Sequence, residues 1–287
     1  DPAYEFSADK VATSKSAGKF FRSFVDYFYL VVSKNTESLH TIEKLQKKNG
    51  WCVGDAHLEN FGVLIQDDGS ANFTANDIDD SGPCPIGLDV ARLLVSFNLY
   101  KVETSVDDMM KAYKKGLKGE SYKIPDFVEA TLEKSRNKGA VAETKKIEND
   151  KLVRDSDVSE VSAQDFSVIA NAVLPLVPTG ARVLDMVATA KASGGSAGML
   201  RYEVLLKVNN SYLHLELKEE TTPSIYPVKT EPIPSLKERV ARSIQIFQAK
   251  PSRYYAAVII GNKEMLVRPK FAGNLRIDWQ DLSHADQ

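Results

Sequence analysis

The chain carries Gly54-Asp55-Ala56-His57-Leu58-Glu59-Asn60-Phe61-Gly62 and, sixteen residues after Asn60, Asn76-Asp77-Ile78-Asp79-Asp80. Phosphoryl transfer needs a carboxylate near the attacking hydroxyl and hard oxygen ligands for magnesium, because the metal neutralises charge on the phosphates. An Asp followed five positions later by an Asn, and then an Asp beyond a predicted hairpin, supplies this set. We therefore assign Asp55 as the base or orienting carboxylate and Asn60 and Asp77 as metal ligands.

The same residues have two other interpretations. Asp-x-x-x-x-Asn is common by chance, and on its own an Asx turn between a strand and a hairpin explains it about equally well. Asp55 with His57 forms Asp-x-His, the opening of dinuclear metallophosphatase sites, but such sites need several more histidines. The other histidines, His40, His214 and His284, do not lie in the motifs of such sites. We expect His57 to brace its loop by hydrogen bonding.

The second half of the chain contains a glycine-rich cluster between two predicted strands, made of Ser193, Gly194, Gly195, Ser196, Ala197 and Gly198. Lys218 lies on the third strand. Backbone N–H groups of such a hairpin can approach phosphates, and a lysine on an adjacent strand neutralises them. A glycine cluster alone is more often a flexible turn, but with Lys218 and a following helix it matches the plan of a protein-kinase small lobe. We expect the two segments to face each other across one cleft, with Lys218 close to Asp77.

Hydrophobic periodicity predicts the remaining elements. Helical spacing indicates helices over 16–32, 37–47, 88–99, 106–117, 125–134 and 163–173. Alternation indicates a strand at 51–53, a hairpin of 61–66 and 72–75, and strands at 182–192, 200–208, 212–219, 255–260 and 264–268. Ser235 with Glu238 forms a capping box that begins a helix running to residue 248. The polar stretch 137–160 predicts a mobile connection.

These elements predict an α+β protein of two lobes. Residues 1–176 form a helical lobe with the catalytic and metal-binding loops, and 177–287 form a small β-rich lobe of five antiparallel strands and one helix. The glycine-rich loop and a C-terminal hinge, Val267-Arg268-Pro269-Lys270, belong to the small lobe. Because the acidic segments come first, the reverse of the order in protein kinases, we expect a circularly permuted protein-kinase-like fold. Arg268 is expected at a solvated strand end, with a nucleotide contact as the alternative.

Several segments resemble one known family. They are 54–62, 76–80, Leu88-Asp89-Val90-Ala91-Arg92-Leu93, Gly195-Ser196-Ala197-Gly198 with Arg201-Tyr202, Leu217-Lys218-Glu219, and Phe20-Phe21-Arg22 near the N-terminus. They resemble the domain-of-unknown-function 2252 family, a mostly bacterial family of uncharacterised proteins that is distantly similar to aminoglycoside phosphotransferases and other kinase-like enzymes. The resemblance covers roughly residues 18 to 270.

The resemblance implies roles for individual residues. Asp55 takes the place of the catalytic-loop acid, Asn60 and Asp77 of the metal ligands, and Lys218 of the phosphate-binding lysine. Asp89 resembles the buried aspartate that braces the catalytic loop, although it could equally be a helix N-cap. Two positions depart from the pattern: Asp79 stands where a protein kinase has the Gly of Asp-Phe-Gly, and Ser193 stands at a usual Gly. Asp79 and Asp80 are expected to be a second metal ligand and a turn residue, or solvated.

The implied function is transfer of the γ-phosphoryl group of ATP, with Mg²⁺, to a hydroxyl of an unknown small molecule or protein. Ser193, Gly194, Gly195, Ser196, Gly198 and Lys218 would bind ATP. The alternatives are a pseudokinase or nucleotide-binding regulatory module, and adenylyl transfer. Lys218 inside the cleft needs a carboxylate partner, for which Glu238 is the candidate, although Glu238 already has a capping role. An ordinary edge-strand lysine is the other interpretation of Lys218.

Composition excludes several classes of protein. The chain has 287 residues with 37 Lys+Arg against 39 Asp+Glu, which offers no general attraction for nucleic acid or anionic lipid. Its most apolar N-terminal stretch, 24–32, is far too short to span a bilayer. Cys52 and Cys84 are expected to be reduced, buried thiols rather than one bridge. We expect a soluble protein, with the cytoplasm slightly favoured as its compartment; the oligomeric state is not encoded in any recognisable motif.

Overall fold

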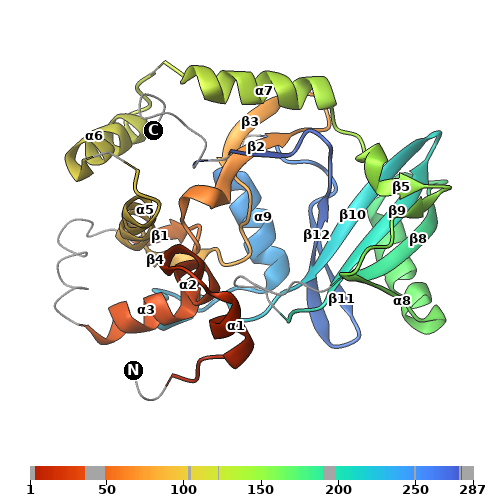
Figure 1. Ribbon diagram of the computed structural model, residues 1–287, viewed down its shortest axis with the longest axis horizontal. Coiled ribbons are helices and arrows are strands. Elements are labelled where there is room, and N and C mark those ends of the chain that lie inside the picture. Colours follow the sequence, from red (N-terminus) through yellow and green to blue (C-terminus); the bar gives the residue numbers. More distant parts are fainter. Residues whose placement is uncertain are drawn as a thin grey trace.

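The computed structural model describes residues 4–35, 49–102, 105–121, 123–189, 198–248, 250–277 and 279. It is a mixed α+β structure with several antiparallel sheets (Figure 1). The predicted helix at 37–47 and the glycine-rich residues Ser193, Gly194, Gly195 and Ser196 lie outside the described residues. Within the described ranges, every helix is too short or too polar to cross a lipid bilayer.

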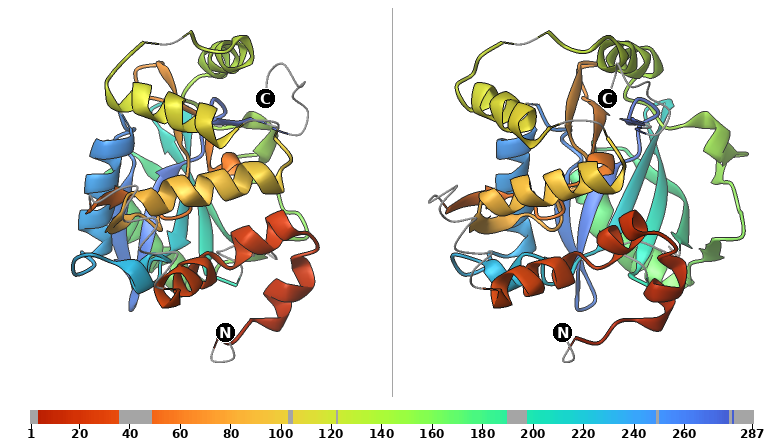
Figure 2. Two further views of the ribbon diagram at one scale, coloured as in Figure 1. Left: turned by 90° about the vertical axis from the view of Figure 1, so that its left-hand side faces the viewer. Right: turned by 60° about the vertical axis from the view of Figure 1, so that its left-hand side comes forward.

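Six helices are described in the first half of the chain. They are α1 (Ala8–Thr13), α2 (Ala17–Ser23), α3 (Val25–Lys34), α5 (Gly87–Leu99), α6 (Val106–Leu117) and α7 (Asp126–Lys138). The single helix predicted over 16–32 is divided into α2 and α3 because Phe24 leaves the helical conformation, with φ −124° and ψ 59°. α5 lies beside α2 and α3, as Figure 2 shows.

Two small sheets hold the acidic segments. β1 (Asn49–Cys52) pairs with β4 (Gly82–Pro85), and β2 (Phe61–Ile65) pairs with β3 (Ala71–Ala75) as the predicted hairpin. A 3-10 turn, η1 (Leu58–Asn60), leads into β2, and β13 (Leu275–Arg276) adds the third strand of that sheet. Segment 54–60 therefore follows β1, and segment 76–80 connects β3 to β4.

The largest sheet has six strands, in the order β11-β12-β10-β9-β8-β7. Its members are β7 (Val158–Glu160), β8 (Arg182–Thr189), β9 (Arg201–Val208), β10 (Ser211–Glu219), β11 (Ala256–Ile260) and β12 (Lys263–Pro269). The five predicted strands are present, and β7 is the addition. One face packs on α8 (Ala163–Val173), whose Ile169 and Val173 are fully buried in the main core.

The other face of this sheet meets α9 and the acidic segments. α9 (Leu236–Phe247) begins at the predicted capping box, since the Ser235 and Glu238 side chains cap each other's backbone N–H groups. Its apolar face, Leu236, Val240 and Ile244, packs between Leu266 of β12 and Val53 and Ile78 of the acidic segments. α9 thus fixes the sheet against these segments. Three short 3-10 turns complete the elements: η2 (Thr144–Lys146), η3 (Leu174–Leu176) and η4 (Tyr226–Val228).

The structure corrects the expectation of a mobile connection over 137–160. This segment forms the hairpin of β5 (Ile147–Glu148) and β6 (Lys151–Leu152) and then strand β7. Long-range polar contacts hold it: Arg154 bonds to both carboxylate oxygens of Asp185 on β8, one at 2.9 Å, and the Leu152 N–H donates to the same carboxylate at 2.7 Å. The polar side chains of this segment hold it through contacts with a distant strand, and hydrophobic periodicity does not reveal such contacts.

Cys52 and Cys84 provide a second correction. They are joined as a disulfide, with Cα atoms 5.9 Å apart, rather than being free thiols. The antiparallel register of β1 and β4 brings them together, because Cys52 lies opposite Gly82 and Cys84 opposite Gly50. The bridge therefore ties together the strands from which the two acidic segments emerge.

Candidate functional site

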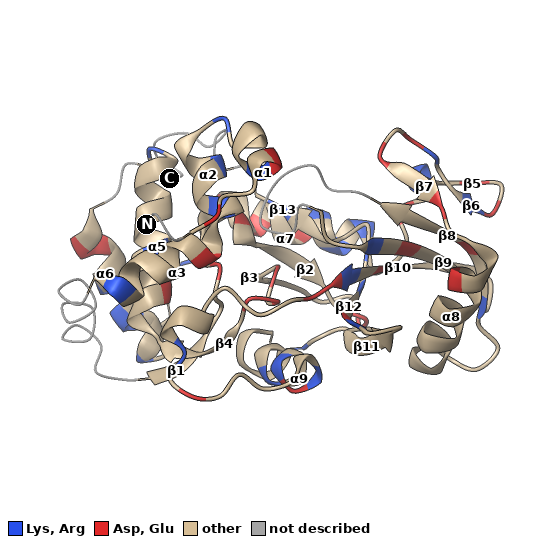
Figure 3. Ribbon diagram, turned by 90° about the horizontal axis from the view of Figure 1, so that it is seen from below, with Lys and Arg blue, Asp and Glu red and all other residues tan. Residues whose placement is uncertain are grey.

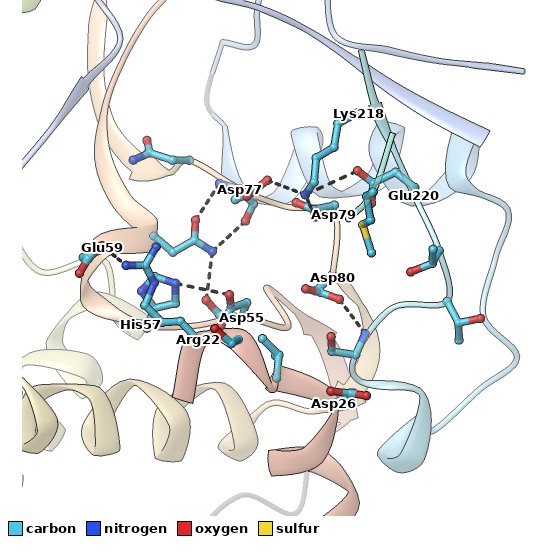
Figure 4. A pocket seen from close by; sticks show the side chains of 18 of the residues that line it. Arg22, Asp26, Asp55, His57, Glu59, Asp77, Asp79, Asp80, Lys218 and Glu220 are labelled. Carbon is cyan, nitrogen blue, oxygen red and sulfur yellow. Dashed lines mark hydrogen bonds and ion pairs between the residues drawn. The ribbon is translucent and has the colours of Figure 1, made fainter. Parts of the chain in front are cut away.

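A cavity of about 210 Å³ lies between the acidic segments and the large sheet. Its walls come from α1 to α3, from the two acidic segments, from the end of β10 with the loop that follows, and from β12 and β13. Figure 4 shows Asp55, Asp77, Asp79 and Lys218 directed into this one space. The expected juxtaposition of the acidic segments with Lys218 is therefore present; we call this cavity the central cleft.

Asp55 stands at a turn that only glycine permits. Gly54 has φ +91°, and a Cβ there would lie 2.0 Å from the Asp80 carbonyl oxygen, so the two acidic segments touch at this point. The Asp55 Oδ1 accepts hydrogen bonds from Arg92 Nε at 3.0 Å and Nη2 at 2.7 Å. His57 Nε2 lies 3.4 Å from Oδ2. Burial alone would raise the pKa of Asp55, but Arg92 and His57 outweigh it and hold the pKa at about 2.

Asn60 links the two acidic segments. Its amide nitrogen donates to the backbone carbonyls of Asp55 and Asp77, each at 3.0 Å, and its amide oxygen accepts from the Asp77 N–H at 2.9 Å. The side chain is buried and engaged at both ends. Asn60 thus holds Asp55 and Asp77 in register here, and its role as a metal ligand stays a prediction.

Lys218 is a buried cation surrounded by carboxylates, with 2 % of its surface exposed. It forms an ion pair with Asp79, and its Nζ lies 3.8 Å from Asp77 Oδ1 and 3.7 Å from Glu220 Oε1. Burial acts to lower the pKa of Lys218, but the three carboxylates raise it well above its ordinary value. The interpretation of Lys218 as a solvated edge-strand lysine is therefore wrong.

The proposed pairing of Lys218 with Glu238 is also wrong. Glu238 is engaged in the capping box, where its carboxylate accepts from the Ser235 N–H at 3.0 Å and the Ser235 hydroxyl at 2.8 Å. The partner of Lys218 is Asp79, for which the sequence predicts a metal-ligand role or a solvated position. Its proximity to Asp77 in the same motif was the available signal.

Asp79 and Asp80 both point inward. Burial, and then the neighbouring Asp77, raise the pKa of Asp79 to about 7 against the opposing effect of Lys218. Burial and the charge of Asp55 also raise the pKa of Asp80, whose carboxylate accepts from the Ser224 N–H at 2.7 Å. The cleft thus holds more carboxylates than its cations neutralise, which favours the binding of a metal cation in it.

A row of buried charges continues from the cleft along the large sheet. Arg268 Nη1 lies 3.1 Å from Asp77, its Nε lies 2.6 Å from Glu216, and Arg201 reaches the other oxygen of Glu216 at 2.5 Å. We call Lys218, Glu216, Arg268 and Arg201 the charged strip; they lie on β10, β12 and β9. Figure 3 colours Lys and Arg blue and Asp and Glu red in this part of the sheet. The expectation of Arg268 at a solvated strand end is therefore wrong, because alternation along β10 and β12 turns these side chains inward.

Asp89 braces the Asp55 loop. Its carboxylate accepts from the Val53 N–H at 2.5 Å and the Gly54 N–H at 3.1 Å, the bracing role that the family resemblance implies. It does not cap its own helix, whose N-cap is Ile86 with no side-chain hydrogen bond. Arg92, one turn further along α5, was not among the predicted site residues. Its signal was its three-residue spacing from Asp89, which places both on one helix face.

Part of the predicted ATP-binding set lies outside the residues that the structure describes. Gly198 is described, exposed and in the left-handed region with φ +78°, whereas Ser193, Gly194, Gly195 and Ser196 lie outside the described residues. Their proposed contact with phosphates stays a prediction.

The donor set is compatible with magnesium, although it does not form a complete cage. Among the described residues, no group of three or more His, Cys, Asp or Glu is arranged to hold a metal ion by itself. His214, the one other described histidine, pairs instead with Glu203 on the large sheet at 2.9 Å. Magnesium usually keeps several waters and uses one or two carboxylates with substrate phosphates. The Asp77 carboxylate is 41 % exposed to the cleft, and the buried Glu220 Oε1 has no hydrogen bond, so oxygen ligands are available.

Fold and site together define an α+β protein with an acid-rich cleft built around one buried lysine. Residues 14–112 match the model of a family described as an uncharacterized protein conserved in bacteria (DUF2252). The match supports the resemblance found in the sequence and includes Asp55, Asn60, Asp77, Asp89 and Arg92, whereas Lys218 lies beyond it. No curated protein and no solved structure matches the chain.

Proposed function

We propose that the protein is a magnesium-dependent phosphotransferase that moves the γ-phosphoryl group of ATP to a hydroxyl. The observation that carries this proposal is the 3.8 Å approach of Lys218 Nζ to Asp77 Oδ1, in the same cleft as Asp55. Residues 141 positions apart in the chain supply the lysine for phosphate and the carboxylate for metal. This combination is what phosphoryl transfer requires.

The strand order supports a circularly permuted kinase-like fold. Counted from β8, five strands are arranged 1-2-3-5-4, with α9 between the third and fourth along the chain. The small lobe of protein kinases has this plan, with its lysine on the third strand, as Lys218 is here on β10. The acidic segments precede the sheet, as the permutation requires. A division at residues 176 and 177 stays a prediction. β7 and α8 precede that point in the chain, yet they pack on the later strands.

In the proposed reaction the acceptor oxygen bonds to the γ-phosphorus while the bond from that phosphorus to the bridging oxygen of ADP breaks. The hydroxyl proton passes to Asp55 or to solvent. Because its pKa is about 2, Asp55 is a weak base, and its main role is to orient the hydroxyl. Lys218 would neutralise phosphate oxygens. Asp77 would hold magnesium, with Asp79 or Glu220 as a second oxygen ligand, and the metal would supply charge neutralisation.

The test compares the wild type with Asp77→Ala. Losing one pre-organised electrostatic contact costs on the order of 3 kcal/mol, so ATP turnover should fall at least about a hundredfold while the fold is retained. Asp126→Ala, on the exposed start of α7, is the matched control. Unchanged turnover in Asp77→Ala would remove the assignment.

One observation favours the alternative of a nucleotide-binding module without catalysis: both ends of the Asn60 amide are occupied by backbone groups. Thermal unfolding with ATP and Mg²⁺ separates the cases, because ligand at 100 times its dissociation constant stabilises by about 2.7 kcal/mol. Stabilisation without phosphoryl or adenylyl transfer indicates a pseudokinase. Release of pyrophosphate in place of ADP indicates adenylyl transfer.

A further inference from the structure

Arg92 on α5 is wholly buried, and two of its three hydrogen bonds converge on one carboxylate oxygen. Nε and Nη2 donate to Asp55 Oδ1 at 3.0 and 2.7 Å, and Nη2 also donates to the Phe21 carbonyl at 2.9 Å. Two N–H groups in the plane of a rigid guanidinium restrict the orientation of the carboxylate more than a lysine ammonium would.

The guanidinium is itself held by aromatic rings. Its Cζ lies 4.0 Å from the centroid of the Phe21 ring on α2 and 5.1 Å from that of Phe28 on α3. Arg92 does not line the central cleft, whereas Asp55 does. A ligand in the cleft would thus meet Arg92 only through Asp55.

This arrangement leaves the second oxygen of Asp55 for the cleft. Both guanidinium donors use Oδ1, and Oδ2 lies beside His57 Nε2, at 3.4 Å, on the cleft wall. The Asp89 carboxylate accepts from the Gly54 N–H on the N-terminal side of Asp55, and the Asn60 amide nitrogen donates to the Asp55 carbonyl. With the backbone held at both ends, the side-chain rotamer is the remaining freedom; Arg92 restricts it at Oδ1, and His57 lies beside Oδ2.

We propose that Arg92 is a positioning residue that turns Asp55 Oδ2 into the cleft to accept the hydrogen bond of the attacking hydroxyl. The proposal rests on the proposed phosphoryl transfer. It also gives α2 and α3 a role in the site, because their Phe21 and Phe28 rings hold the guanidinium in place. A displacement of about 1 Å in a reacting group can cost on the order of a hundredfold in rate.

The test is a double-mutant cycle of Arg92→Met and Asp55→Asn, read as ADP release from ATP with Mg²⁺ and water as acceptor. Arg92→Met should lower kcat by about 100-fold and change the KM for ATP by less than about twofold, because it alters orientation without touching nucleotide. In the Asp55→Asn background the same substitution should change kcat by less than about twofold. An equal loss in both backgrounds, or none in either, would overturn the proposal.

Arg154→Met is the matched control, because it breaks another Arg–Asp pair, with Asp185, away from the cleft. It should lower thermal stability and leave kcat unchanged. If Arg92→Met does not fold, Phe21→Leu keeps the charge and removes the ring; a kcat loss of about three- to tenfold is then expected, and an unchanged kcat contradicts the proposal.

A crystal structure of the Arg92→Met or Phe21→Leu variant separates this proposal from the proposed function. An Asp55 rotamer unchanged from the wild type overturns the positioning role even if the wild type turns over ATP. If Asp55 is rotated in the variant but the wild type does not turn over ATP, the positioning role is supported and the phosphotransferase assignment is removed.

Discussion

Asp55 combines two properties that usually oppose each other, burial and a firmly held negative charge. Burial acts to raise the pKa of Asp55, but Arg92 and His57 lower it by more, so the pKa falls from its ordinary value of 3.8 to about 2. A carboxyl group whose pKa is lower in the folded than in the unfolded chain stabilises the fold above its unfolded pKa, and this stabilisation is lost as pH falls through the folded pKa. The relevant window is therefore about pH 4 to 2.

Asp55→Asn should consequently lower the free energy of unfolding by a pH-dependent amount. The difference from the wild type at pH 7 should exceed the difference near pH 2 by about 2 kcal/mol, because each pKa unit is worth about 1.4 kcal/mol. Urea unfolding at a series of pH values measures it, with the exposed Asp126→Asn as control. A difference that does not change with pH would show that Arg92 leaves the Asp55 titration unaltered.

The candidate site could be predicted in its outline and not in its pairings. Asp55, Asn60, Asp77 and Lys218 were identifiable because motif spacing marks chemistry within each segment. Which carboxylate meets Lys218 depends on how β10 approaches the loop between β3 and β4, a long-range relation that spacing does not contain. For this reason the spacing alone favours Glu238 over Asp79 as the partner of Lys218.

At the scale of elements, strong periodicity was sufficient and weak periodicity was not. The hairpin of β2 and β3 and strands β8 to β10 show alternation and turn residues, and they occur close to where predicted. β5, β6 and β7 are two or three residues long and polar. They owe their conformation to partners elsewhere, above all Asp185 and β8.

The disulfide between β1 and β4 should stabilise the folded chain. Cys52 and Cys84 are 32 positions apart, and closing a loop of that length in the unfolded chain is worth about 4 kcal/mol. The double variant Cys52→Ala and Cys84→Ala should therefore unfold at lower denaturant, by about that free energy. Two reactive thiols in the unfolded wild type without reductant, together with unchanged stability of the variant, would contradict the bridge.

Across the whole molecule the chain passes between the helical part and the large sheet more than once. β7 and α8 join the sheet before β8 begins, and β13 returns after β12 to pair with β2. The two-lobe division at residues 176 and 177 would separate α8 from the core that it covers.

A fragment of residues 157–274 should consequently fold better than one of residues 177–274. The shorter fragment loses Ile169 and Val173, both fully buried, and each such side chain contributes about 1.5 to 3 kcal/mol. Limited proteolysis and far-ultraviolet circular dichroism of the two fragments measure the difference. Equal protease resistance would show that α8 is dispensable for the sheet.

The charged strip also affects how ligand binding depends on the salt concentration of the solution. Its ion pairs are buried, and dissolved salt screens buried pairs far less than exposed ones. A polyanion that enters the cleft exchanges one set of internal partners for another, so few counterions are released. Its affinity should accordingly depend only weakly on ionic strength, unlike that of a protein that captures phosphate on an open basic surface.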